Sequence, residues 1–148
     1  DLLLRFIELM PVSTTQVLTE ANFLPSGEAK KLIEIRFGKL KLRPDIRTNG
    51  PATYYEIPET SQIIGFIGAM TNLHFCESCN KLLLTCEGKL RPCLGRHLEF
   101  DMREVLRNPE MTDDDIAKFF LHVVDRKPEM HEFRDNYQPG RKMIAIGG

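Results

Sequence analysis

The chain has 148 residues, 42% of them hydrophobic and 28% charged, which is the composition of a folded domain and excludes an intrinsically disordered chain. Its 20 basic and 21 acidic residues leave a net charge of -1, so no long-range field attracts nucleic acid or an anionic membrane, and any anion must be held by locally placed bases. No apolar run approaches the ~18 residues of a membrane span, and no signal-peptide pattern opens the chain. We therefore expect a cytoplasmic protein with neither a nucleic-acid nor a membrane partner.

The first third of the chain predicts a strand, a helix and a loop. Residues 2–11 are densely apolar and end at a proline, which favours a buried strand. Ser26 can cap a helix whose apolar positions recur at helical spacing and which Gly38 closes. Residues 43–51 combine two prolines with an Asn-Gly pair and are typical of a loop. Because the chain begins at Asp1 and opens directly into an apolar strand, we expect it to be a fragment of a longer protein.

Three further strands are expected over residues 52–58, 61–70 and 81–93. The connections between them are short, which favours an antiparallel arrangement. The last of the three contains a tight-turn signal at Glu87-Gly88, so we expect it to fold into a hairpin.

The hydrophobic period changes to that of helices after the hairpin. Residues 98–108 and 111–127 are amphipathic, and Thr112, followed by three acidic residues, is a suitable cap for the second helix. The apolar stripe of this helix, expected to be core, consists of Ile116, Phe119, Phe120 and Val123. Residues 138–148 add a turn and a strand-like apolar run. The pattern as a whole predicts an α+β fold, with an antiparallel sheet, a cysteine hairpin and two or three helices.

All four cysteines lie between residues 76 and 93. A disulfide framework would spread its bridges to tie distant segments together, so this clustering favours a metal or iron–sulfur site. Cys76 and Cys79 form a C-x2-C pair that can direct two thiolates at one centre, and Cys93 can add a third ligand from the far arm of the hairpin. With Cys86 included, four thiolates would instead close a structural zinc site.

The position of Cys86 favours three ligands over four. Cys86 comes immediately before the expected turn, whereas Cys93 returns toward the Cys79 end of the hairpin. At about 3.3 Å per strand residue, Cys86 then lies beyond coordination distance from the other thiols. We expect Cys86 to serve as a small apolar residue.

Five motifs in order resemble the radical SAM GTP 3',8-cyclases of molybdenum cofactor biosynthesis. "RFIELMP" at 5–11 is similar to a strand of that family, and "GFIGAM" at 65–70 is similar to the run before its cysteines. "FCESCNKLLLTCEGKLRPCL" at 75–94 resembles its second-cluster motif. "DRKPEMHEF" at 125–133 resembles its R-K-x3-H-x-F region, and "RKMIAIGG" at 141–148 resembles its terminus, which ends in two glycines.

The resemblance implies a fold and a reaction. It implies that residues 1–45 are the end of an incomplete radical SAM α/β barrel and that residues 46–148 form the C-terminal domain with the second cluster and the GTP site. In the family, a first [4Fe-4S] cluster cleaves S-adenosylmethionine, and the resulting radical converts GTP to 3',8-cyclo-7,8-dihydroguanosine triphosphate. The second [4Fe-4S] cluster has three cysteine ligands and binds the guanine through its open iron. The expected partner is therefore GTP. A homodimer with a second copy of the chain is left open, because the oligomeric state is not readable from these residues.

The resemblance also assigns roles to individual residues. The cluster ligands are Cys76, Cys79 and Cys93, the GTP-binding bases are Arg5 and Lys81, Met10 lies beside S-adenosylmethionine, and Gly147 and Gly148 form the catalytic terminal pair.

The sequence departs from the family in two respects. The family has Arg-x-Arg after the C-x2-C-N stretch, and Lys81 and Leu83 stand at those positions here. Lysine keeps the charge but lacks the bidentate fork of arginine, and leucine offers phosphate nothing. No C-x3-C-x2-C motif for the first cluster occurs in these residues. The alternatives are a radical SAM relative with another substrate and a small structural zinc module. His74 is expected to be a packing or hydrogen-bonding residue, and no role is assigned to His131.

Overall fold

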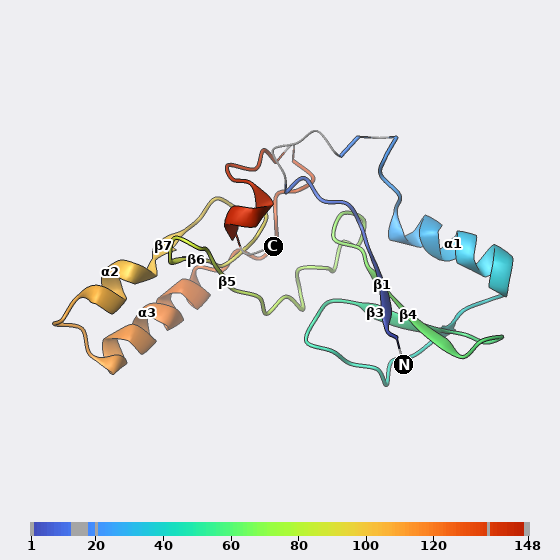
Figure 1. The fold of residues 1–148 in the computed structure, drawn as a ribbon, viewed down its shortest axis with the longest axis horizontal. Helices are drawn as coiled ribbons and strands as arrows, with labels where there is room; N and C mark the ends of the chain where they lie inside the picture. Colours follow the sequence, from blue (N-terminus) through green and yellow to red (C-terminus); the bar gives the residue numbers. More distant parts are fainter. Residues whose placement is uncertain (1, 13–17, 20, 136, 147–148) are drawn as a thin grey trace. The chain divides into compact units, whose positions relative to one another are not determined.

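The structure, a computed structural model, describes residues 2–12, 18–19, 21–135 and 137–146. The chain divides into two compact units that meet in the sequence between Cys79 and Asn80, and the first strand belongs to the first unit (Figure 1). Each unit contains its own small sheet and its own hydrophobic core. The mixed α+β class expected from the sequence is confirmed.

The sheet of the first unit has four strands in the order β1-β4-β3-β2. These are β1 (Leu4–Ile7), β2 (Lys41–Leu42), β3 (Thr53–Ile57) and β4 (Gln62–Ile67). The pairs β2–β3 and β3–β4 are antiparallel, as the short connections indicated, whereas β1 lies parallel to β4 at the edge. This sheet combines strands from both sides of residue 45, and the division of the chain at 45–46 stays a prediction.

Helix α1 (Ser26–Phe37) packs on one face of this sheet. Alternation along β3 and β4 turns every second side chain toward the helix, and the resulting core consists of Leu40, Ile57, Ile64 and Phe66 with Ala29, Ile33, Phe37 and Tyr55 packed against it. Gly38 ends the helix as expected, with φ of 78° and its N–H donated to the Glu34 carbonyl at 3.0 Å. The prediction that Ser26 caps the helix is wrong, because Ser26 is the first helical residue. Its N–H, which has no acceptor within the helix, donates to the Glu8 carboxylate at 2.8 Å.

The second unit begins with an antiparallel sheet in the order β5-β6-β7, covered by two helices. Its strands are β5 (Leu83–Leu84), β6 (Lys89–Arg91) and β7 (Phe100–Asp101), and its helices are α2 (Met102–Arg107) and α3 (Asp113–Asp125). Its core consists of Leu90, Met102 and Val123, with Leu82, Phe100, Ile116 and Phe119 packed against it.

The helix ends of the second unit correct the sequence prediction in detail. The helix expected from residue 98 begins only at Met102, because the Asp101 carboxylate accepts the N–H groups at the start of α2. Thr112 caps α3 in a reciprocal capping box with Asp115, as predicted. Phe120 is 39% exposed, so its place in the buried stripe was wrong.

The last described segment, η1 (Met143–Ile146), is a 3-10 helix where a strand was expected. No helix in the described ranges combines the length and apolar character needed to cross a bilayer.

Candidate functional site

Cys76 and Cys79 lie in a series of tight turns that follows β4. The chain folds back through hydrogen bonds from Asn72 N–H to the Gly68 carbonyl at 3.0 Å and from Phe75 N–H to the Asn72 carbonyl at 3.2 Å. The next turn carries both cysteines, with Cys79 N–H donating to the Cys76 carbonyl at 3.0 Å. Both thiols are free and partly exposed. The two cysteines of the C-x2-C pair therefore lie on one turn.

Glu8 anchors the start of this cysteine turn. Its carboxylate is only 3% exposed and accepts the N–H of Ser26 at 2.8 Å, of Met70 at 2.7 Å and of Thr71 at 3.0 Å, together with the Thr71 hydroxyl. One carboxylate thus connects the end of β1, the N-terminus of α1 and the segment that leads to Cys76. Burial alone would raise the pKa of Glu8, but the hydrogen bonds from Ser26, Thr71 and Met70 outweigh it and lower the pKa below its usual value.

The histidine of the cysteine turn is engaged with a neighbouring carboxylate. His74 Nδ1 lies 2.7 Å from Glu77 Oε1, and both side chains are exposed. The expectation that His74 is a hydrogen-bonding residue is confirmed.

Cys93 and Cys86 lie at opposite ends of the second unit's hairpin. Leu83 pairs with Arg91 and Leu84 with Leu90, so the arms meet in a register that places Cys93 near the base. Cys86 lies in the turn at the other end, is exposed, and has its Sγ 3.6 Å from the Ala145 carbonyl oxygen. The expected separation of the two thiols along the hairpin is confirmed, but Cys86 is not the buried residue that a purely apolar role would favour.

Gly88 makes the hairpin turn possible. Its φ of 79° lies in the left-handed region that side chains rarely adopt, and its N–H donates to the Thr85 carbonyl at 2.9 Å.

Lys127 ties the base of the hairpin together, a role that the sequence did not reveal. Its ammonium group donates to the carbonyl of Lys81 at 2.8 Å and to the carbonyl of Pro92 at 2.6 Å. These carbonyls belong to the two arms, and the second immediately precedes Cys93. Lys127 therefore fixes the backbone from which Cys93 projects. No local pattern could have shown this, because the two acceptors are main-chain atoms far from Lys127 in the sequence.

We expect Lys127→Met to lower the free energy of unfolding by about 2 kcal/mol, because two main-chain carbonyls lose a charged donor while the apolar stem is kept. Lys118→Met is the matched control, since Lys118 lies on α3 with a side chain that is 74% exposed, and its change is expected to stay within about 0.5 kcal/mol. Chemical denaturation of the two variants measures the difference. Equal shifts would contradict the assigned role.

Glu99 gathers three basic side chains behind the hairpin. Its carboxylate lies 3.1 Å from Arg141 Nη2, 3.6 Å from Arg91 Nε and 3.9 Å from Lys89 Nζ. Arg141 also pairs with Glu87 in the hairpin turn, and this hydrogen bond lowers the pKa of Glu87. Arg141 thus fastens the segment just before η1 to the hairpin.

His131 is a packing residue rather than an exposed ligand. It is buried against Phe133, with ring centroids 4.5 Å apart, and its Nδ1 accepts the Phe133 N–H at 3.2 Å. Gly95 packs beside both residues, where an added Cβ would come within 2.7 Å of the His131 Cβ and 2.8 Å of the Phe133 ring.

Among the described residues, the three expected cluster ligands do not form a recognisable metal site. Cys76 and Cys79 belong to the first unit and Cys93 to the second. Within the described ranges, no three His, Cys, Asp or Glu side chains form a group that could hold a metal ion. The three-cysteine site stays a prediction: Cys76 and Cys79 share one turn, and Cys93 lies near the base of the hairpin. Gly147 and Gly148 lie outside the described residues.

Arg5 is one of the residues that line a pocket of the first unit. The pocket has a volume of about 270 Å³ and is lined by Arg5, Thr48, Asn49, Gly50, Ala52 and Ile67. The Arg5 Nε donates to the Tyr54 hydroxyl at 2.8 Å. Met10 follows the end of β1 and is partly buried. Lys81 is exposed at the base of the hairpin.

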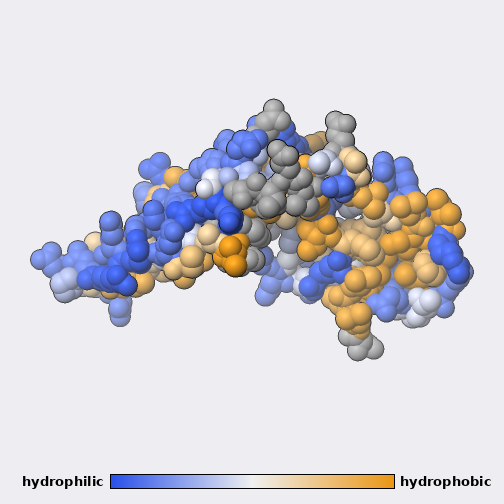
Figure 2. All heavy atoms as spheres, turned by 45° about the horizontal axis from the view of Figure 1, so that its top comes forward, coloured by the Kyte–Doolittle hydropathy of each residue, from blue (hydrophilic) through white to orange (hydrophobic). Residues whose placement is uncertain are grey.

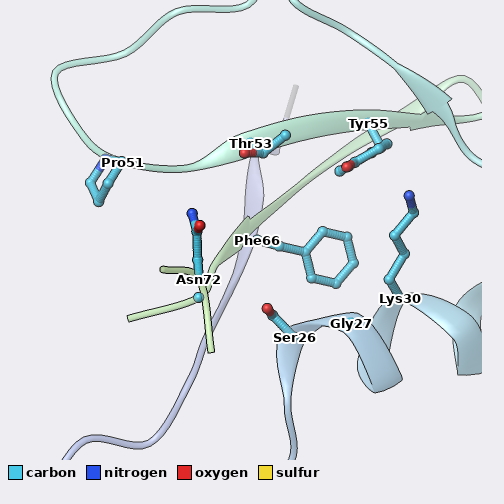
Figure 3. A pocket seen from close by; sticks show the side chains of 9 residues that line it. Ser26, Gly27, Lys30, Pro51, Thr53, Tyr55, Phe66 and Asn72 are labelled. Atoms are coloured by element: carbon cyan, nitrogen blue, oxygen red, sulfur yellow. The ribbon is translucent and has the colours of Figure 1, made fainter. Parts of the chain in front are cut away.

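A second pocket of the same unit, of about 190 Å³, lies between α1 and the sheet (Figure 3). Figure 3 shows the Phe66 ring between the sheet and the helix, with the Ser26 hydroxyl and the Lys30 side chain on the helix side. The Lys30 ammonium lies 4.0 Å from the centre of the Tyr55 ring, a cation–π contact. An added Cβ at Gly68 would come within 2.9 Å of the Ser26 hydroxyl, which would have to turn away.

Comparison with known proteins agrees with the motifs. The sequence profile of the family described as Molybdenum Cofactor Synthesis C matches residues 2–133. The chain is 38% identical over 144 residues to a GTP 3',8-cyclase of Desulforamulus reducens, 40% over 145 residues to one of Moorella thermoacetica, and 37% over 152 residues to one of Rhizobium meliloti. These matches cover 97%, 98% and 98% of the chain but only 44%, 44% and 42% of the relatives' own length. The chain belongs to the Molybdenum Cofactor Synthesis C family.

Proposed function

We propose that this chain is the C-terminal part of a radical SAM GTP 3',8-cyclase and that it holds the second [4Fe-4S] cluster and GTP. The observation that carries the proposal is the similarity of residues 2–133 to the Molybdenum Cofactor Synthesis C family and of nearly the whole chain to GTP 3',8-cyclases. Cys76 and Cys79 share one turn with free thiols, and Cys93 lies at a hairpin base that Lys127 holds, while Cys86 lies at the opposite tip. These local features support three thiolate ligands rather than four.

The donor set fits an iron–sulfur cluster. Three soft thiolates match the ligands that iron–sulfur clusters take, and Cys76, Cys79 and Cys93 would supply them. When bound, such a cluster offers an iron without a protein ligand, to which the guanine of GTP can attach. A closed zinc site would need Cys86 as its fourth ligand. Cys86 is exposed at the hairpin tip beside the Ala145 carbonyl, which favours three ligands.

Arg5 and Lys81 would hold the triphosphate. The planar fork of Arg5 suits two phosphate oxygens at once, and Lys81 offers a single ammonium group. Leu83, where the family has a second arginine, contributes no charge. We therefore assign Arg5 a larger share of phosphate binding than a site with all of the family's arginines would give it.

The surface of the first unit supports its place in a larger barrel. Figure 2 shows hydrophobic residues gathered over this unit, toward the right of the view. Large apolar side chains of β1 and α1 are exposed, among them Leu4 at 44%, Ile7 at 59% and Ile35 at 82%. A sheet edge and a helix face of this kind need covering. We assign the cover to the other strands and helices of a radical SAM barrel, in which Met10 would lie beside S-adenosylmethionine. Gly147 and Gly148 would reach the active site.

Anaerobic reconstitution with iron and sulfide, followed by electron paramagnetic resonance of the reduced protein, tests the proposal. We expect a [4Fe-4S] signal that shifts when GTP is added. If the cluster signal of the full-length enzyme does not change when GTP is added, the result points instead to a radical SAM relative with another substrate. Tight zinc binding without any cluster would contradict both enzyme functions.

A further inference from the structure

Three residues of the first unit form a single row across its sheet. Gly65 in β4 is the register partner of Arg5 in β1 and also of Tyr54 in β3. Side chains at one register position share one face of a sheet, so Arg5 and Tyr54 lie on the same face with the glycine between them. Tyr55, the next residue of β3, packs on the opposite face in the core with α1.

Gly65 leaves the space through which Arg5 and Tyr54 meet. An added Cβ at Gly65 would come within 2.8 Å of the Tyr54 ring and 3.4 Å of the Arg5 Cγ. The Tyr54 ring therefore lies over the backbone of β4, which a side chain at this position would prevent. The Arg5 guanidinium carbon lies 5.8 Å from the centre of that ring.

The Tyr54 hydroxyl holds the Arg5 side chain through a defined hydrogen-bond chain. Arg5 Nε donates to the Tyr54 hydroxyl at 2.8 Å, and the Thr48 hydroxyl lies 3.0 Å from the same oxygen. Tyr54 is only 2% exposed, so it is a fixed partner. Because Nε is the atom engaged, the two terminal nitrogens of the guanidinium are left for a bidentate ligand such as a phosphate.

We propose that Tyr54 is a positioning residue that orients Arg5 for the triphosphate of GTP, with Thr48 fixing the Tyr54 hydroxyl. The inference rests on the proposed function and deepens it. Arginine side chains lose much rotamer freedom when they bind, and a partner that fixes the side chain beforehand reduces that loss. This fixing of Arg5 matters more here because Lys81 and Leu83 stand where the family has two arginines, so fewer guanidinium groups are available to the phosphates. Thr48 also lines the pocket beside Arg5.

The test compares Tyr54→Phe with Tyr55→Phe in the full-length enzyme reconstituted with iron and sulfide. Each change removes one hydroxyl from the same strand, but only Tyr54 contacts Arg5. Dissociation constants are measured for GTP and for guanosine, which lacks the phosphates. We expect Tyr54→Phe to weaken GTP about tenfold and to leave guanosine unchanged, and Tyr55→Phe to change neither.

A double-mutant cycle with Arg5→Ala separates positioning from a general structural effect. Tyr54→Phe is expected to have no further effect on GTP affinity once Arg5 is alanine. Thr48→Val is a second variant that leaves Tyr54 intact, and it should weaken GTP two- to threefold. The inference is overturned if Tyr54→Phe weakens GTP and guanosine equally, or weakens GTP as much in the Arg5→Ala background. A wild-type enzyme that binds no GTP would overturn the proposed function, and the inference with it.

Discussion

Replacing Cys93 with serine is expected to remove nearly all of the iron that the reconstituted chain binds. A cluster held by three thiolates cannot lose one of them without losing most of its affinity, because serine is a poor ligand for iron at neutral pH. Iron and sulfide analysis, with the cluster's absorption spectrum, measures the loss. Cys76→Ser and Cys79→Ser are expected to behave in the same way.

Cys86→Ser is the matched control for this prediction. Cys86 is the same residue type in the same hairpin, but it lies at the tip and its Sγ is 3.6 Å from the Ala145 carbonyl oxygen. We expect its iron content to equal that of the unmodified chain, since a serine hydroxyl can still donate to this carbonyl. Loss of bound metal in Cys86→Ser would favour a closed four-thiolate site and count against the three-ligand cluster.

Glu8→Gln is expected to lower the free energy of unfolding by about 3 kcal/mol. Glutamine has nearly the same shape, but its amide group donates where a carboxylate oxygen accepted. The donors of Ser26, Met70 and Thr71 converge on both oxygens, so the amide nitrogen must face at least one N–H. Glu77→Gln is the control, because Glu77 lies in the same cysteine turn with a side chain that is 71% exposed. Its expected change is within about 0.5 kcal/mol. A small effect at Glu8 would contradict the anchoring role.

The difference between the unmodified chain and Glu8→Gln should depend on pH with a defined sign. The pKa of Glu8 in the folded chain lies below its ordinary value of 4.5. A carboxyl group with a lowered pKa contributes stability that is fully present above the pKa of the unfolded chain and is lost as the pH falls through the folded pKa. The stability advantage over Glu8→Gln is therefore expected to be constant near neutral pH and to shrink below about pH 4.5. Denaturation curves across this range measure it, and a pH-independent difference would contradict the assignment.

Helix ends and turns could be predicted from the sequence where a single residue determines the local backbone conformation. Gly38 ends α1, Gly88 makes the hairpin turn and Thr112 caps α3, each through its own conformation or its own side chain. The expected separation of Cys86 from Cys93 followed from the turn between them. These features depend on neighbours within a few residues, so the sequence pattern contains what is needed to predict them.

Features that depend on distant partners could not be predicted in this way. The first N–H of α1, that of Ser26, is accepted by the carboxylate of Glu8, which lies 18 residues earlier and reaches the helix only through the tertiary fold. The Lys127 ammonium group donates to the main-chain carbonyls of Lys81 and Pro92, which lie 46 and 35 residues away in the sequence. The contact of Arg5 with Tyr54 needs the parallel pairing of β1 with β4, which short connections did not suggest.

The parallel pairing of β1 and β4 has a consequence for folding during translation. Leu4 pairs with Ile64 and Ile7 with Ile67, so β1 has no partner in this sheet until β4 has been synthesised. During that interval β1 lacks its β4 neighbour, and closing so long a loop is slow compared with forming a local hairpin. An unpaired strand edge favours misassembly. Slowing translation between the codons for β1 and β4 is expected to lower the yield of soluble protein.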